Sequence, residues 1–238
     1  MKKNSLLLFI CLAYLSAYVF EGCRKEKIDE YEPDRPFQHI PESTTPSPVM
    51  TTSFIEDFNE YNLGNKGWVT NNSGTDFWRN GTANECDKDN YCYGFPAFSK
   101  TFDDYEYLAV FPPQHQPLGI SSWLLSPVLS VKNGDKISFF TRTQVNNGFH
   151  DKLEVRMNNG TFNNVGGSVS TVGSFTTLLL SVNPNNNAGT YPSTWTKYEY
   201  TFNGITGTIE TRLGFRYTVP AGKKAKNIGV DQFIFEKN

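Results

Sequence analysis

Hydrophobic and polar residues alternate with a period of two along most of the chain after residue 51. The clearest stretch is KLEVRM at 152–157, where Leu, Val and Met alternate with Lys, Glu and Arg. KYEYTF at 197–202 and ETRLGFRY at 210–217 repeat this alternation. Successive side chains of a β-strand point to opposite faces, so each stretch predicts a strand with one apolar face.

Short segments rich in Asn and Gly separate the alternating stretches. KNGD, NNGF, MNNG and PAGKK are examples, and all are typical of turns. Aromatic residues make up 15% of the chain and are mostly Phe and Tyr, which favours strands over helices. Many short strands broken by turns, each with one apolar face, predict an all-β chain folded as an antiparallel β-sandwich. We place this single domain at residues 51–238.

The first 22 residues have the features of an export signal. Lys2 precedes an apolar run at 6–20, which is shorter than the roughly 20 residues that span a membrane. Cys23 follows Gly directly, and this junction resembles a bacterial lipobox, in which the cysteine carries the lipid. The alternative is a plain signal peptide in which Cys23 has no such role. We expect a lipid anchor at Cys23, at the outer membrane or cell surface of a Gram-negative bacterium.

Residues 23–50 differ sharply in composition from both neighbours. They combine five prolines with charged and hydroxyl side chains. Such a segment buries too little apolar surface to offset the entropy lost on ordering, and its prolines favour an extended chain. We therefore expect a flexible tether between the membrane anchor and the domain.

The order of motifs within residues 53–236 resembles the bacterial choice-of-anchor J family and the related cleaved-adhesin domains. The matching stretches are FIEDFN, GW, SSWLLSPVLSVKNGDKISFFTRT, HDKLEVRM, TWTKYEYTF, RLGFRY and GVDQFIF. The resemblance implies a jelly-roll sandwich. It also implies a secreted or surface-attached module for adhesion or glycan binding, usually without assigned catalysis. The insertion NECDKDNYCYGF departs from the family pattern.

Two carboxylates fall within apolar faces of predicted strands. Glu56 shares its face with two phenylalanines in FIEDF, and Asp231 does so in DQFIF. The first and last strands of a jelly roll commonly lie side by side, so we expect Glu56 and Asp231 to converge. Calcium takes 6–8 oxygen ligands of this kind, which predicts a structural calcium site. The alternatives are a salt bridge to Arg142 or Arg216, or a carboxylate that reaches water at a strand end.

Cys86 and Cys92 are the cysteines that remain after the signal and anchor. Exported proteins meet an oxidising compartment, so the spacing C-x5-C predicts a disulfide. Zinc needs about four ligands, and no second Cys or His pair lies nearby in the sequence.

Aromatic residues gather around this cysteine loop, among Asn and Asp side chains. The candidates are Trp78, Tyr91, Tyr93 and Phe95. Sugar rings stack on exposed aromatic faces while amides and carboxylates bond their hydroxyls, so this stretch predicts a glycan site. The alternative is that these aromatic side chains fill the core beneath a long loop.

Composition and motifs narrow the function class. The net charge is −2 without a run of Lys or Arg in the body, which disfavours a nucleic-acid partner. The chain has no G-x-S-x-G, H-E-x-x-H or phosphate-binding Gly loop. We expect a non-enzymatic surface module that binds a glycan or another cell-surface ligand. A glycoside hydrolase or other hydrolase on a jelly-roll scaffold, and a structural surface-assembly subunit, are the alternatives.

Overall fold

β-Strands make up nearly all the regular structure of this chain. The computed structural model describes residues 47–59, 63–72, 78–83, 94–98, 106–112, 117–144 and 148–238. The strands in these ranges are β1 (Val49–Met50), β2 (Phe54–Glu56), β3 (Val69–Asn72), β4 (Trp78–Gly81), β5 (Tyr107–Val110), β6 (Ile120–Leu125), β7 (Val128–Lys132), β8 (Lys136–Thr143), β9 (Lys152–Met157), β10 (Thr177–Val182), β11 (Thr196–Thr201), β12 (Thr208–Thr211), β13 (Leu213–Val219) and β14 (Ile228–Glu236). The helical element among them is the 3-10 helix η1 (Leu63–Lys66).

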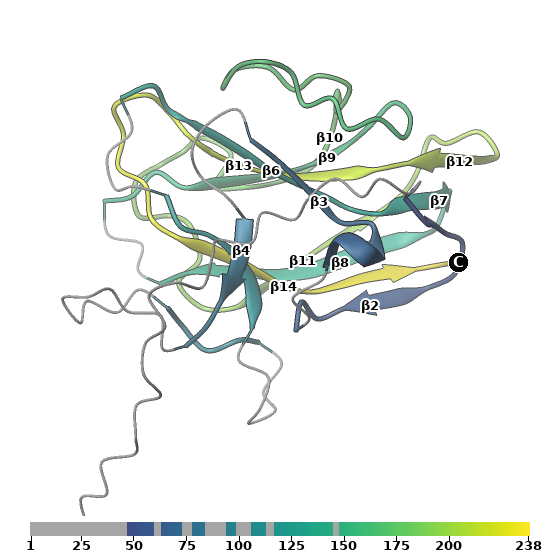
Figure 1. Ribbon diagram of the computed structural model, residues 1–238, viewed down its shortest axis with the longest axis horizontal. Helices are drawn as coiled ribbons and strands as arrows, with labels where there is room; N and C mark the ends of the chain where they lie inside the picture. Colours follow the sequence, from purple (N-terminus) through teal and green to yellow (C-terminus); the bar gives the residue numbers. More distant parts are fainter. Residues whose placement is uncertain are drawn as a thin grey trace, which may run out of the picture. The chain divides into compact units, whose positions relative to one another are not determined.

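Two large antiparallel sheets face each other, which confirms the predicted β-sandwich (Figure 1). One sheet has the order β10-β9-β13-β6-β3. The other has the order β11-β8-β14-β5-β4, with β2 paired to β14. The chain passes repeatedly between them, as expected for a jelly roll. A smaller sheet, β1-β7-β12, contains the parallel pair β1–β7.

The apolar faces predicted from the alternation form the core between the sheets. Phe215 on β13 contacts Phe139 on β8 and Phe233 on β14, with ring centroids 5.2 and 5.8 Å apart. All three side chains are fully buried. Burial of such aromatic side chains supplies much of the free energy of folding. The polar residues that alternate with them point to the outer faces of the sheets.

Regular structure begins slightly before the expected start of the domain. Val49 and Met50 form β1 and pair with Val128 and Leu129 of β7, so the last two residues assigned to the tether lie in a strand. The predicted signal peptide and the anchor residue Cys23 lie outside the described residues. In the part of the chain that is described, no helix has the length and apolar character needed to cross a membrane.

Candidate functional site

Trp78 and Phe95 do not form the predicted stacking surface. Trp78 begins β4 opposite Val110, and its side chain is fully buried in the core between the sheets. Phe95 is 3% exposed and stacks on Tyr107 with a centroid separation of 4.3 Å. A buried ring offers no face to a sugar, so assigning Trp78 and Phe95 to ligand binding was wrong. Tyr91 and Tyr93 lie outside the described residues.

Glu56 lies on β2, which pairs with β14, and its side chain faces the core, as the alternation of apolar residues predicts. It lies opposite Phe233 and is 2% exposed. Its Oε1 accepts a hydrogen bond from the Phe58 amide at 3.1 Å and pairs with Lys66 Nζ at 3.2 Å. Burial raises the pKa of Glu56, and the charge of Lys66 opposes this rise. The carboxylate is thus held by a salt bridge, to Lys66 rather than to the predicted Arg142 or Arg216.

Asp231 points to the other face of β14, away from Glu56. A register shift separates Asp231 from Ile234, and Gln232 has a left-handed φ of 48°. This irregularity breaks the alternation, so Asp231 shares the outer face with its partner Phe140. Its Oδ2 accepts the Phe98 amide at 2.7 Å. The predicted convergence of Glu56 and Asp231 is therefore wrong.

Neither the calcium ion nor the disulfide is decided by this geometry. In the described ranges, no group of three or more Asp, Glu, His or Cys side chains is arranged to hold a metal ion. Calcium binding by this protein stays a prediction. Cys86 and Cys92 lie outside the described residues, so their disulfide also stays a prediction.

The outer face of the five-stranded sheet carries a regular array of residues that includes four charged side chains. The register aligns three neighbouring strands, so that outward residues form rows across β9, β13 and β6. The first row is Lys152, Thr218 and Ser121; the second is Glu154, Arg216 and Trp123; the third is Arg156, Gly214 and Leu125. This array collects charged residues that are separated along the sequence.

Glu154 is the centre of an ion cluster in this array. Its carboxylate contacts Lys152 Nζ at 2.7 Å, Arg156 Nε at 2.7 Å and Arg216 Nη1 at 3.2 Å. Burial tends to raise the pKa of Glu154, but hydrogen bonds from Arg156 and Lys152 outweigh it and lower the pKa to about 2. Three positive charges and one negative charge leave the cluster with a net charge of +2.

The segment between β9 and β10 covers part of this face. Phe175 packs on Trp123, with ring centroids 5.3 Å apart. Gly214 permits this contact, because a Cβ there would lie 2.8 Å from Trp123 and 2.9 Å from Phe175. Arg216 Nη2 also donates to the Val169 carbonyl. Beside Val169, Lys152 and Thr218 of the first row stay partly exposed, whereas Ser121 is buried.

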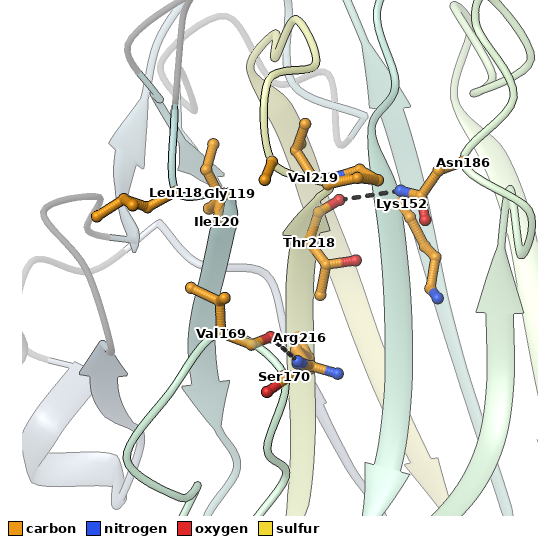
Figure 2. A pocket seen from close by; sticks show the side chains of 12 residues that line it. Leu118, Gly119, Ile120, Lys152, Val169, Ser170, Asn186, Arg216, Thr218 and Val219 are labelled. Atoms are coloured by element: carbon orange, nitrogen blue, oxygen red, sulfur yellow. Dashed lines mark hydrogen bonds between the residues drawn. The ribbon is translucent and has the colours of Figure 1, made fainter.

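A hollow of about 280 Å³ lies where the cover ends (Figure 2). Figure 2 shows Thr218 and Arg216 between Leu118 on one side and Lys152 with Asn186 on the other. Asn186 Nδ2 donates to the Thr218 carbonyl at 3.3 Å and the His150 carbonyl at 2.8 Å. The remaining lining residues are Gly119, Ile120, Val169, Ser170, Val219, Pro220 and Ala221. The hollow thus joins hydrogen-bonding groups to aliphatic walls.

The sequence showed the members of this site only as the polar positions of strands. Lys152, Glu154 and Arg156 were identified as the polar half of KLEVRM, and Arg216 as that of ETRLGFRY. Charged residues at period two on two separate strands are the signal that pointed here. The register that makes them neighbours is not readable from the sequence.

Several solved structures are similar to this chain at low sequence identity. The K1 cleaved adhesin domain of Lys-gingipain from Porphyromonas gingivalis W83 has 17% identity and a TM-score of 0.50, over 79% of this chain and 99% of that domain. The K3 domain has 16% identity and a TM-score of 0.49, over 77% and 98%. The CBM22-1 xylan-binding domain of Paenibacillus barcinonensis Xyn10C has 14% identity and a TM-score of 0.41, over 77% of this chain and 92% of that domain.

The likeness to the K1 domain shows that the chain has the β-sandwich fold of a cleaved adhesin domain. No protein-family model matches the sequence. No curated protein sequence matches it either. Membership of the choice-of-anchor J family stays a prediction.

Proposed function

We propose that this chain is an exported, non-catalytic module that binds a glycan in the hollow beside Arg216. The observation that carries the proposal is the composition of the hollow. Thr218, Lys152 and Ser170 offer hydrogen-bonding groups next to aliphatic side chains. A sugar ring presents hydroxyls at its edge and C–H groups on its faces, so it matches both kinds of surface.

The size and support of the hollow favour binding of a single sugar residue. Its volume of about 280 Å³ is slightly smaller than that of typical ligand pockets, which measure about 300–1,000 Å³. Thr218 and Arg216 belong to β13, and Lys152 belongs to the neighbouring β9. Side chains on paired strands hold their positions better than side chains on loops, which suits specific recognition.

The expected location of the protein at a cell surface supports this assignment. The proposed anchor at Cys23 and the tether after it would place the domain at a cell surface. A weak single site is sufficient there, because many copies on one surface bind with avidity. Recognition of a surface or host glycan fits this arrangement.

Binding of the purified full chain to a glycan array tests the proposal. We expect at least one glycan to bind, and we expect Ser170→Tyr to reduce that binding strongly by filling the exposed rim of the hollow. Thr161→Tyr is the matched control, because Thr161 is exposed on the same covering segment and does not line the hollow. Absence of glycan binding would contradict the function, and full binding by Ser170→Tyr would contradict the site.

A further inference from the structure

We propose that the hollow recognises an anionic sugar, namely a terminal residue that carries a carboxylate or a sulfate. This inference rests on the proposed function and specifies its ligand class. It is carried by the charge of the hollow and by the donors that remain on its two cations. Figure 2 shows the two cations, Lys152 and Arg216, among the residues that line the hollow.

The hollow is positively charged. Lys152 and Arg216 line it, and none of the other described residues that line it is acidic. Glu154 lies beside them in the array and pairs with both, which leaves these three side chains with a net charge of +1; Arg156, the third cation of the cluster, does not line the hollow. A partly desolvated site with excess positive charge favours an anion over a neutral ligand of the same shape.

The two cations retain N–H donors after their contacts within the protein. Arg216 has five N–H groups. Hydrogen bonds to Ser121, Glu154 and the Val169 carbonyl use three of them. Lys152 has three N–H groups, and Glu154 takes one. Both side chains therefore keep unused N–H groups without releasing Glu154; those of Lys152 are the more accessible, because Arg216 is only 7% exposed.

The rest of the lining indicates a sugar as the carrier of the anion. Thr218 lies directly opposite Lys152 across the strand pair. Its hydroxyl makes no hydrogen bond to another described residue. Leu118 stands at the rim with 79% of its surface exposed, and Val219 and Pro220 continue the aliphatic wall. A ring with hydroxyls, C–H groups and one charged substituent satisfies all three features.

An array that pairs charged and neutral forms of the same glycans tests the inference. We would print oligosaccharides ending in a uronic or sialic acid beside their methyl esters and beside 6-O-sulfated counterparts, and apply the full chain. We expect the free acids or the sulfates to bind at least about tenfold more tightly than the esters, because charge-assisted hydrogen bonds are about twice as strong as neutral ones. Comparison of the carboxylate and sulfate probes identifies which anionic group the hollow recognises.

A charge-matched pair of variants locates the effect. Lys152 and Lys197 each form an ion pair with the glutamate two residues later, on strands of different sheets. Lys152→Gln should weaken binding of the anionic probe about tenfold and reduce its dependence on salt, whereas Lys197→Gln should leave both unchanged. Equal melting temperatures of the two variants would show that both fold.

Three results would overturn the inference. Esters that bind as tightly as acids and sulfates would contradict the anionic class and leave glycan binding intact. Anion binding that Lys152→Gln does not weaken would place the ligand elsewhere. Failure of every printed glycan to bind would contradict the proposed function as well.

Discussion

Trp78 illustrates how a residue proposed for ligand binding serves the core instead. Its ring is fully buried, and truncation to alanine would leave a cavity among the residues of both sheets. We expect Trp78→Ala to lower the free energy of unfolding by ~3–5 kcal/mol, measured by urea denaturation. Trp195→Ala is the control, because Trp195 is only partly buried. Equal losses in the two variants would contradict a core role specific to Trp78.

Asp151 makes stability depend on pH. Its Oδ1 accepts hydrogen bonds from Tyr217 Oη at 2.7 Å and the Lys226 amide at 2.8 Å. Burial outweighs these contacts and raises the pKa of Asp151 from 3.8 to about 6. The folded state thus binds the proton more tightly, so this group stabilises the fold below pH 4 and loses that contribution as pH rises through 6. The change is on the order of 3 kcal/mol.

Asp151→Asn should reduce the slope of the free energy of unfolding between pH 4 and 7, measured by denaturant titration at each pH, and leave the part that comes from Glu56, whose pKa burial also raises. Glu154 supplies a contrast with the opposite sign. Its lowered pKa of about 2 stabilises the fold above pH 4.5, and that contribution is lost as pH falls toward 2. Glu154→Gln should leave the slope between pH 4.5 and 7 in place. A slope that is unchanged in Asp151→Asn would assign it to another group.

At the scale of elements, the irregularity in β14 places two carboxylates on opposite faces of the sheet. Glu56 and Asp231 lie on opposite faces and have different partners. We therefore expect the effects of Glu56→Gln and Asp231→Asn on unfolding to add within about 0.5 kcal/mol, with or without EDTA. Coupling above that level which EDTA abolishes would indicate a shared cation after all.

Strands were predictable where odd and even positions along the strand alternate regularly between the core and the solvent. KLEVRM and KYEYTF coincide with β9 and β11 almost to the residue, because one buried face enforces the alternation. The same argument failed for Asp231, since a single left-handed residue, Gln232, inverts the faces after it. The hollow was not predictable, because it depends on the register of β9 against β13. Local pattern does not encode that pairing.

At the scale of the whole molecule, the lipid predicted at Cys23 would set where the domain works. We predict that Cys23 carries the lipid, so Cys23→Ser should move the protein from the membrane fraction to the soluble fraction. Mass spectrometry of the N-terminal peptide checks the acyl chain directly. Unchanged fractionation together with an unmodified peptide would contradict the anchor.

The contact of Arg216 with the covering segment has a consequence for the kinetics of recognition. Its guanidinium links β13 to the segment between β9 and β10 through the Val169 carbonyl. Phe175 of that segment also packs on Trp123 of the sheet. The covering segment and the sheet are thus fixed to each other before any ligand binds. A pre-organised hollow loses little conformational entropy on association and needs no slow rearrangement. Association would then be fast, and dissociation would be set by the few contacts that the small hollow offers rather than by a rearrangement of the protein.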